Sequence, residues 1–267
     1  MNYTEKIETQ EHLKNDVLCY WQMQGYIDNE TGITSRHLPK GQNLLIFNYG
    51  NEIGYLDEDK IEFSNPEFFI VAAINSSRII NQKGKIDLFG ISFIGEGLFK
   101  LIQQPAKDFI RDSPNALKEK YRDLYIKMSK ENFSGKTEMA ERFVAGNLNQ
   151  KMSSPPFQQA IKIINRAQGN ILVHEIANKV YVSERQLQRL FKTRLGITPK
   201  DYCKIVRINN YLEFILKKRN SVDWMELVVK FNYHDQPHLI NEVKSISRLS
   251  PKKLLSYRDT LYDRYTS

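Results

Sequence analysis

Two short segments of this chain carry side chains that are suited to contact base pairs in double-stranded DNA. The first segment offers Arg185, Gln188, Arg189 and Lys192. An Arg can donate two hydrogen bonds to one guanine, and a Gln can bond one adenine in the same way. We therefore assign Arg185, Gln188 and Arg189 to base edges and Lys192 to a phosphate.

The second segment carries a different set of side chains in the same register. It offers Gln236, His238 and Asn241 to base edges and Lys244 to a phosphate. None of these four is an Arg, the residue that most often makes a specific base contact. We therefore expect the second segment to discriminate sequences more weakly or more indirectly, through the shape of the DNA.

A duplicated helical pattern positions both segments. Leu187 and Leu239, Lys192 and Lys244, and Pro199 and Pro251 are each 52 residues apart. In a helix-turn-helix, the N-terminal part of the second helix faces the base edges. The repeat therefore predicts two helix-turn-helix units on one chain, with inward-facing apolar residues at Leu187, Phe191, Leu239 and Val243.

Capping signals and one long apolar stripe set the distance between these units. Ser183 with Gln186, and Thr198 with Asp201, are spaced as capping boxes, and Gly196 suits a left-handed helix end. The helix that follows Pro199 is predicted to run for about 18–20 residues, which makes it roughly 27–30 Å long. Successive major grooves on one side of DNA are about 34 Å apart. The helix can therefore hold the two units about one DNA turn apart.

Charge and proline content divide the chain into two parts. Residues 1–152 contain 19 Lys and Arg against 21 Asp and Glu, whereas residues 153–267 contain 20 against 10. A basic surface confined to the duplicated part favours nucleic acid as its partner. We expect a linker at 153–156, because proline disfavours helix in the residue before it. The linker separates a sensor or dimerisation domain at 1–152 from a DNA-binding domain at 157–258.

The first part is predicted to be β-rich at 1–110 and helical at 111–152. Short runs of strand-forming residues, separated by polar turns, predict strands at 17–21, 23–27, 44–49, 68–74, 78–80 and 86–94. The expected fold class is α+β, with a small β-sandwich or barrel plus helices, followed by an all-α domain whose two helix-turn-helix units are joined by a long helix. The helices at 115–150 could form a subunit interface or pack on their own domain.

Many aromatic residues in the first part could line an apolar ligand pocket or form the core of the β-domain. They are Tyr20, Trp21, Tyr26, Phe47, Tyr49, Phe68, Phe69, Phe89 and Phe93. Core packing is the commoner role for such residues, so the effector-binding residues are left unassigned.

Residues 157–257 resemble the AraC/XylS family of bacterial transcription regulators. The resemblance rests on Ile176-Ala177, the run from Ser183 to Lys192, Gly196-Ile197-Thr198-Pro199 with Tyr202, Tyr233 to His238, and Leu249-Ser250-Pro251. Residues 1–150 are similar, more weakly, to the variable sensor half of such regulators. The resemblance implies a DNA-binding regulator, an effector, a homodimer, contact with RNA polymerase and, most commonly, an activator.

The second unit departs from the pattern of that family. A Gly is usual at Asn232 and Arg248, a Ser at Pro237, a basic residue at Asn241, and aromatics at Leu239 and Val243. Asn tolerates a left-handed conformation, Leu and Val still fill a core, and Pro237 loses no intrahelical bond as second residue of a helix. We expect these changes to preserve the fold and to affect base contacts.

Other chemistry finds little support in the sequence. His234 and His238 have a zinc-like spacing, but no Cys or third His lies near them, so we expect neither a metal nor a cofactor. Ser92 lies in a strand pattern rather than in a nucleophile turn, and we expect no enzyme. No apolar run reaches the length of a membrane span and no signal peptide is recognised. Together with two cysteines, Cys19 and Cys203, expected to be free, this indicates a cytoplasmic protein.

The sequence therefore predicts an effector-responsive regulator that binds two adjacent major-groove segments. Two alternatives remain open: an enzyme with a β-barrel catalytic domain tethered to DNA, and an architectural DNA-binding protein without a sensor. The first would require a cluster of acid, base or metal-ligating residues in 1–110. The second would be disfavoured by a ligand that stabilises the N-terminal half.

Overall fold

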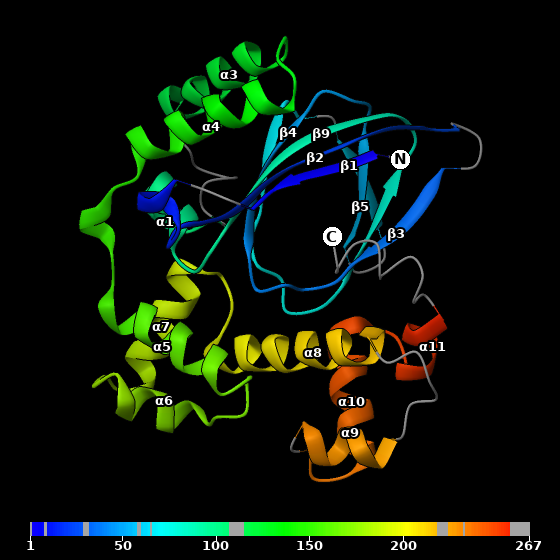
Figure 1. Ribbon diagram of the computed structural model, residues 1–267, viewed down its shortest axis with the longest axis vertical. Coiled ribbons are helices and arrows are strands. Elements are labelled where there is room, and N and C mark those ends of the chain that lie inside the picture. Colours follow the sequence, from blue (N-terminus) through cyan, green and yellow to red (C-terminus); the bar gives the residue numbers. More distant parts are fainter. Residues whose placement is uncertain are drawn as a thin grey trace.

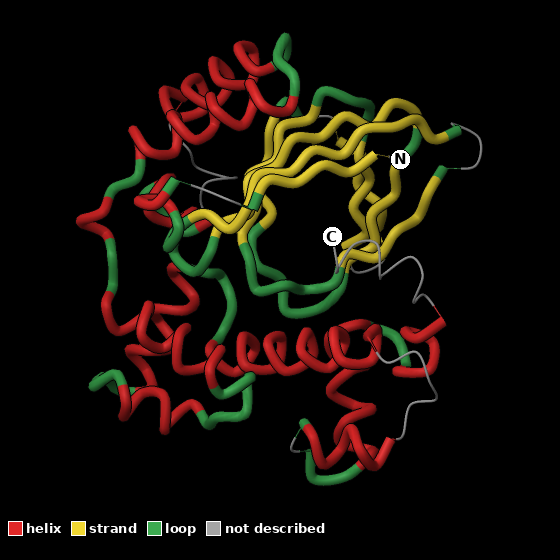
Figure 2. The backbone as a smooth tube through the Cα atoms, viewed as in Figure 1, coloured by secondary structure: helices red, strands yellow, loops and turns green. Residues whose placement is uncertain are grey.

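The computed structural model describes residues 2–7, 10–28, 32–57, 60–64, 66–106, 115–217, 224–231 and 233–256. The described strands lie between Asn2 and Phe93, and the described α-helices follow from Gly97 onward. Figure 2 shows the strands gathered in one part of the molecule and the helices around it. The predicted fold class, an N-terminal β-rich domain with helices followed by an all-α domain, is confirmed.

Two antiparallel sheets form the N-terminal domain and curve around a shared interior (Figure 1). The five-stranded sheet has the order β1 (Asn2–Lys6), β2 (Val17–Ile27), β9 (Gly84–Phe93), β4 (Asn43–Asn48) and β7 (Phe68–Val71). The four-stranded sheet has the order β3 (Ile33–His37), β8 (Arg78–Gln82), β5 (Ile53–Asp57) and β6 (Lys60–Ser64). The register places Phe47 opposite Phe89 on one side and Phe68 on the other.

The central strands of the five-stranded sheet are buried on both faces. Along β2, Tyr20 packs with the helical layer, whereas its neighbour Trp21 packs between the two sheets. Successive side chains of a strand point to opposite faces, so a strand that is buried on both sides is mostly apolar along its length. This explains why the strands with continuous hydrophobic sequence were predicted. Of the strands that were missed, β1, β3 and β6 have mostly polar sequences, and β5 has a short apolar stretch interrupted by Gly54.

Helices cover the outer face of the five-stranded sheet. They are α1 (Gly97–Ile102), α3 (Asn115–Met128) and α4 (Phe133–Asn147), flanked by short 3-10 turns at Glu11–Leu13 and Gln150–Met152. Tyr121, Leu124 and Val144 pack against the sheet, so α3 and α4 are bound to their own domain. A buried ion pair fixes α1, because the Lys100 amine donates to both oxygens of Asp16 at 2.6 and 2.7 Å.

The aromatic side chains of this domain lie mainly in its core. Four of those named above, Tyr20, Phe47, Phe89 and Phe93, are fully buried beneath the helices. Tyr49 and Phe68 pack at the edge of the same cluster, and Trp21 and Phe69 lie between the sheets. Tyr26 is exposed. Of the two roles considered for these residues, core packing describes most of them.

Seven helices form the C-terminal domain within the described residues. They are α5 (Pro155–Arg166), α6 (Val173–Lys179), α7 (Glu184–Arg194), α8 (Pro199–Lys217), α9 (Trp224–Lys230), α10 (Gln236–Ser247) and α11 (Pro251–Ser256). Helix α5 begins two residues before the expected Phe157, because proline is tolerated in the first turn of a helix. Helix α8 crosses beneath the β-domain, with α5 to α7 at one end and α9 to α11 at the other (Figure 1).

Two further features concern helix hydrophobicity and the cysteines. None of the helices in the described ranges has the length and hydrophobicity that a bilayer crossing requires. Cys19 and Cys203 are buried and free, as expected. Burial raises the pKa of the Cys203 thiol to about 11 and that of Cys19 to about 12.

Candidate nucleic-acid interface

The first helix-turn-helix consists of α6 and α7. The Ser183 hydroxyl accepts from the Gln186 amide N–H at 3.2 Å, and the Gln186 side chain accepts from the Ser183 N–H at 2.9 Å. This capping box fixes where α7 begins and therefore which side chains face outward. Leu187 and Phe191 are fully buried. The opposite face of α7 is exposed and carries Arg185, Gln188, Arg189 and Lys192.

The second helix-turn-helix consists of α9 and α10. The Asp235 carboxylate accepts from the His238 amide N–H at 2.7 Å, so Pro237 is the second helical residue, as predicted. Leu239 and Val243 are fully buried and fill the core in place of aromatics. The exposed face of α10 carries Gln236, His238, Asn241 and Lys244. The rings of His238 and Tyr233 pack edge to face, with their centroids 5.4 Å apart. Asn232 lies outside the described residues.

Helix α8 separates the two units and has the predicted length. It contains 19 residues, which corresponds to about 28 Å. Its start is fixed by the second capping box, in which the Asp201 carboxylate accepts from both the N–H and the hydroxyl of Thr198. Gly196, with a φ of +96°, makes the left-handed turn before it. Both are the signals from which this helix was predicted.

A buried cluster around Arg207 ties the two units together. Arg207 of α8 donates to both oxygens of Glu242 of α10, at 2.7 and 2.9 Å. It also donates to the Asn170 side chain at 3.1 Å, in the turn before α6. Burial opposes the charge on Arg207, but its bonds to Glu242 hold its pKa above the usual value. The Tyr233 hydroxyl donates to Glu242 at 2.9 Å, and burial, followed by the Glu242 charge, raises the pKa of Tyr233.

The beginnings of the two exposed helices border one cleft. Its volume is about 870 Å³, and it is lined by Glu184 of α7, by Arg207 of α8, and by His238 and Asn241 of α10. The N-terminal ends of α7 and α10 therefore open onto the same side of α8. One ligand that spans this cleft could contact both exposed faces.

The N-terminal domain binds the C-terminal end of α7. Glu96 lies just before α1 and is almost fully buried; its carboxylate accepts from Arg194 of α7 at 2.5 Å. The same carboxylate accepts from the Ser154 N–H at 3.0 Å and from Gln158 of α5 at 2.8 Å. The Arg194 guanidinium also donates to the Met152 carbonyl at 2.6 Å and lies over the Phe99 ring.

The N-terminal domain also binds the C-terminal end of α10. The Ser77 N–H donates to the Ile246 carbonyl at 2.6 Å, and the Ser77 hydroxyl donates to the Ser247 carbonyl at 2.7 Å. Arg36 of β3 donates to the Ser77 hydroxyl at 2.9 Å. The last carbonyls of a helix lack intrahelical partners, so these bonds satisfy them. Both exposed helices are thus held at their C-terminal ends by the β-domain.

Apolar contacts fill the space between these two attachments. Leu38 and Ala73 of the N-terminal domain belong to the core of the C-terminal domain. A Cβ atom on Gly41, whose φ is +70°, would meet the Tyr202 ring at 2.8 Å, so this close approach requires glycine. Sequence reasoning missed this whole interface, because its partners lie far apart in the chain and neither shows a local pattern.

Comparisons with known proteins agree with the helix-turn-helix units. Residues 176–257 match a family model described as a helix-turn-helix domain, and residues 5–113 match one described as a domain of unknown function. The HTH-type transcriptional regulator ArgR of Pseudomonas aeruginosa is 24% identical over 124 residues, which is 43% of this chain. The match spans 37% of the length of that curated relative.

Solved structures overlap loosely with this chain. ToxT from Vibrio cholerae has a TM-score of 0.47 at 9% identity, over 96% of this chain and 98% of that one. The AraC-like transcriptional activator CuxR has a TM-score of 0.30 at 12% identity, over 76% and 78%. A cupin superfamily protein from Desulfitobacterium hafniense has a TM-score of 0.26 at 18% identity, over 35% and 78%. Overlaps this loose add nothing to the functional argument.

Proposed function

We propose that this chain is a transcription regulator of the AraC/XylS type, which binds one specific DNA sequence through two successive major grooves. The match of residues 176–257 to a helix-turn-helix model supports this proposal. The observation that carries the proposal is the pair of capped, outward-facing helices α7 and α10, separated by the 19 residues of α8. The 19 residues of α8 make it about 28 Å long, which approaches the roughly 34 Å of one DNA turn. A modest bend of the DNA would close the difference.

The two exposed faces divide into base contacts and phosphate contacts. Arg185, Gln188 and Arg189 contact base edges in the first groove, and Lys192 contacts a phosphate. In the second groove Gln236, His238 and Asn241 contact base edges, and Lys244 contacts a phosphate. All eight side chains are exposed, and His238 and Asn241 also line the cleft that Glu184 of α7 borders. A side chain must be exposed to reach a groove.

The N-terminal domain regulates this binding. The domain boundaries that we propose are 1–152 for the regulatory domain, 153–156 for the linker and 157–258 for the DNA-binding domain. Support comes from the two attachments, Glu96 to Arg194 and Ser77 to the end of α10. A ligand that binds one arrangement of these contacts better than another would change the affinity for DNA. The family resemblance favours a homodimer that acts as an activator and contacts RNA polymerase.

Selection of bound sequences from random DNA by the purified full-length chain tests the proposal. We expect a consensus with two conserved blocks about one helical turn apart, the first block more sharply defined than the second. Footprinting of the selected site should show protection of both blocks on one side of the duplex. Selection without enrichment, or a single conserved block, would contradict the proposal.

A further inference from the structure

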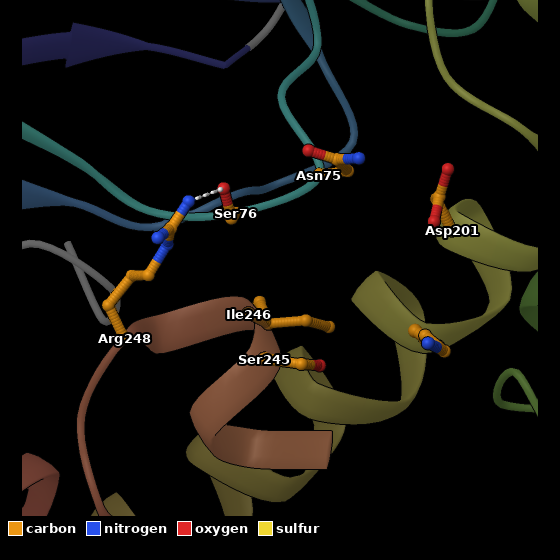
Figure 3. A pocket seen from close by; sticks show the side chains of 7 residues that line it. Asn75, Ser76, Asp201, Ser245, Ile246 and Arg248 are labelled. Atoms are coloured by element: carbon orange, nitrogen blue, oxygen red, sulfur yellow. Dashed lines mark hydrogen bonds between the residues drawn. The ribbon is translucent and has the colours of Figure 1, made fainter. Parts of the chain in front are cut away.

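A polar cavity lies where the N-terminal domain meets α8 and the end of α10 (Figure 3). Its volume is about 310 Å³. Asn75 and Ser76 line it from the loop between β7 and β8, and Ser245, Ile246 and Arg248 line it from α10 and the residue after it. Asp201 and Lys204 of α8 complete the wall. The cavity is therefore lined by both domains and by α8, the helix that connects the two helix-turn-helix units.

The charges in this cavity are unbalanced. Lys204 is half-buried, and among the residues that the structure describes it has no hydrogen bond or ion pair. The one carboxylate of the wall, on Asp201, already accepts two hydrogen bonds from Thr198 as a helix cap. Since a partly buried cation without a partner is unfavourable, an anion in the cavity would be attracted to Lys204.

Arg248 adds a second positive charge, and its backbone has an unfavourable conformation. Its φ is +59°, in the left-handed region that side chains with a Cβ atom rarely adopt. Its guanidinium reaches across the cavity toward the Ser76 hydroxyl, at 3.5 Å (Figure 3). That distance marks a weak hydrogen bond, so most of the donors of Arg248 are available to a ligand.

The remaining lining groups are small and neutral. Asn75, Ser76 and Ser245 present amide and hydroxyl groups, and the Ser245 hydroxyl donates to the Glu242 carbonyl at 2.8 Å, which leaves its oxygen free to accept. Such groups recognise hydroxyls. The volume lies at the lower end of the range for ligand sites, so the occupant is a small molecule.

From these observations we propose that the cavity binds a small anion that carries hydroxyl groups, such as a sugar phosphate or a sugar acid. Lys204 and Arg248 bind the anionic group, and Asn75, Ser76 and Ser245 bind the hydroxyls. Ser76 lines the cavity and its neighbour Ser77 binds the end of α10, so the bound anion would strengthen the attachment of the N-terminal domain to α10. Only the effect of this attachment on DNA binding rests on the proposed function.

Calorimetric titration of the full-length chain with three probes tests the site. The probes are glucose 6-phosphate, gluconate and neutral glucose, so the first two distinguish the source of the negative charge and the third removes it. We expect saturable binding of at least one anion and at least about tenfold weaker binding of glucose, because a charge-assisted hydrogen bond is lost. No binding of either anion at millimolar concentration, or equal binding of glucose, would overturn the proposal.

Variants locate the bound anion. Lys204→Met and Arg248→Ala should each weaken anion binding by about tenfold, whereas Lys204→Arg should retain it. Lys200→Met is the matched control, because Lys200 lies one turn earlier on the same helix, is exposed and does not line this cavity. Unchanged binding in both Lys204→Met and Arg248→Ala would place the anion elsewhere and overturn the assignment.

Two further measurements keep the result interpretable. Circular dichroism confirms that each variant is folded; if Lys204→Met is not, Arg248→Ala and Lys204→Arg decide the question. DNA selection without any anion is measured on the same preparations. A chain that binds the anion but selects no DNA contradicts the proposed function alone, whereas a chain that selects DNA but binds no anion contradicts this inference alone.

Discussion

Arg189 is the side chain from which we expect the largest share of sequence discrimination in the first groove. It is exposed on α7, between Arg185 and Lys192, and among the described residues it has no ion pair that would restrain it. Arg189→Ala should weaken binding to the selected site by about 1–3 kcal/mol and relax the preference at one base position. Quantitative binding to a set of single-base variants of the site measures both effects.

Arg166→Ala provides the control for Arg189, because Arg166 is exposed near the end of α5 and outside both reading helices. Its base preferences should match those of the unaltered chain. If Arg189→Ala retains the full sequence preference, Arg189 does not contact a base.

Lys192 should behave differently from Arg189. A Lys that contacts a phosphate releases counterions whatever the base sequence. Lys192→Ala should therefore weaken binding equally on specific and random DNA and reduce the slope of log affinity against log salt by about one. Titrations at several salt concentrations measure this slope. A slope equal to that of the unaltered chain would remove Lys192 from the interface.

At the residue scale, local spacing determined how much could be predicted. The burial of Leu187 and Phe191 and the exposure of Arg189 follow from a capping box and a helical period, both visible within ten residues. Glu96 and Arg194, by contrast, are 98 residues apart, and no local pattern connects them. Their ion pair exists only because the two domains meet there.

At the scale of elements, the Arg207–Glu242 pair links α8 to α10 of the second helix-turn-helix unit. Both side chains are largely buried, with 18% and 5% of their surface exposed. Arg207→Met leaves Glu242 without a counter-ion, and we expect it to reduce the free energy of unfolding by about 3 kcal/mol. Urea unfolding followed by circular dichroism measures the loss.

A second substitution separates the charge from the packing. The double variant Arg207→Met, Glu242→Leu removes both charges, so it should recover most of the lost stability. The single variant Glu242→Leu completes the cycle. If the losses of Arg207→Met and Glu242→Leu are additive in the double variant, the ion pair contributes no coupling energy between α8 and α10.

The elements that could be predicted are those whose own sequence carries capping residues or turn signals. Helix α8 begins at a capping box and contains 19 residues, within the expected length. Strands β1 and β3 were missed because a polar strand at a sheet edge has neither an apolar run nor a turn signal of its own. Their pairing with β2 and β8 is a property of the assembled sheets.

At the scale of the whole molecule, the buried thiols make the free energy of unfolding depend on pH in the alkaline range. Burial raises the pKa of Cys203 to about 11 from its ordinary value of 9.0. The unfolded chain therefore ionises this thiol first, so its contribution is complete below the ordinary pKa and is lost as pH rises toward the folded value. Between about pH 8 and pH 10 the unaltered chain should lose about 1 kcal/mol more stability than Cys203→Ala.

Urea midpoints of the two chains at both pH values provide the measurement. Cys203→Ala costs some packing at every pH, so only the change of the difference with pH is informative. A difference that stays constant over this range would mean that the thiol ionises equally easily in the folded and unfolded chains.

The two attachments of the β-domain to α7 and α10 also limit how such a protein can be recombined. A hybrid chain that keeps this N-terminal half and receives another C-terminal half at the linker would lose the donor to Glu96 and the acceptor for Ser77. Under the proposed function, we expect the exchanged half to bind its own DNA site without responding to a ligand of the N-terminal half. A working graft must transfer Arg194 and the last turn of α10 together with the half that they contact.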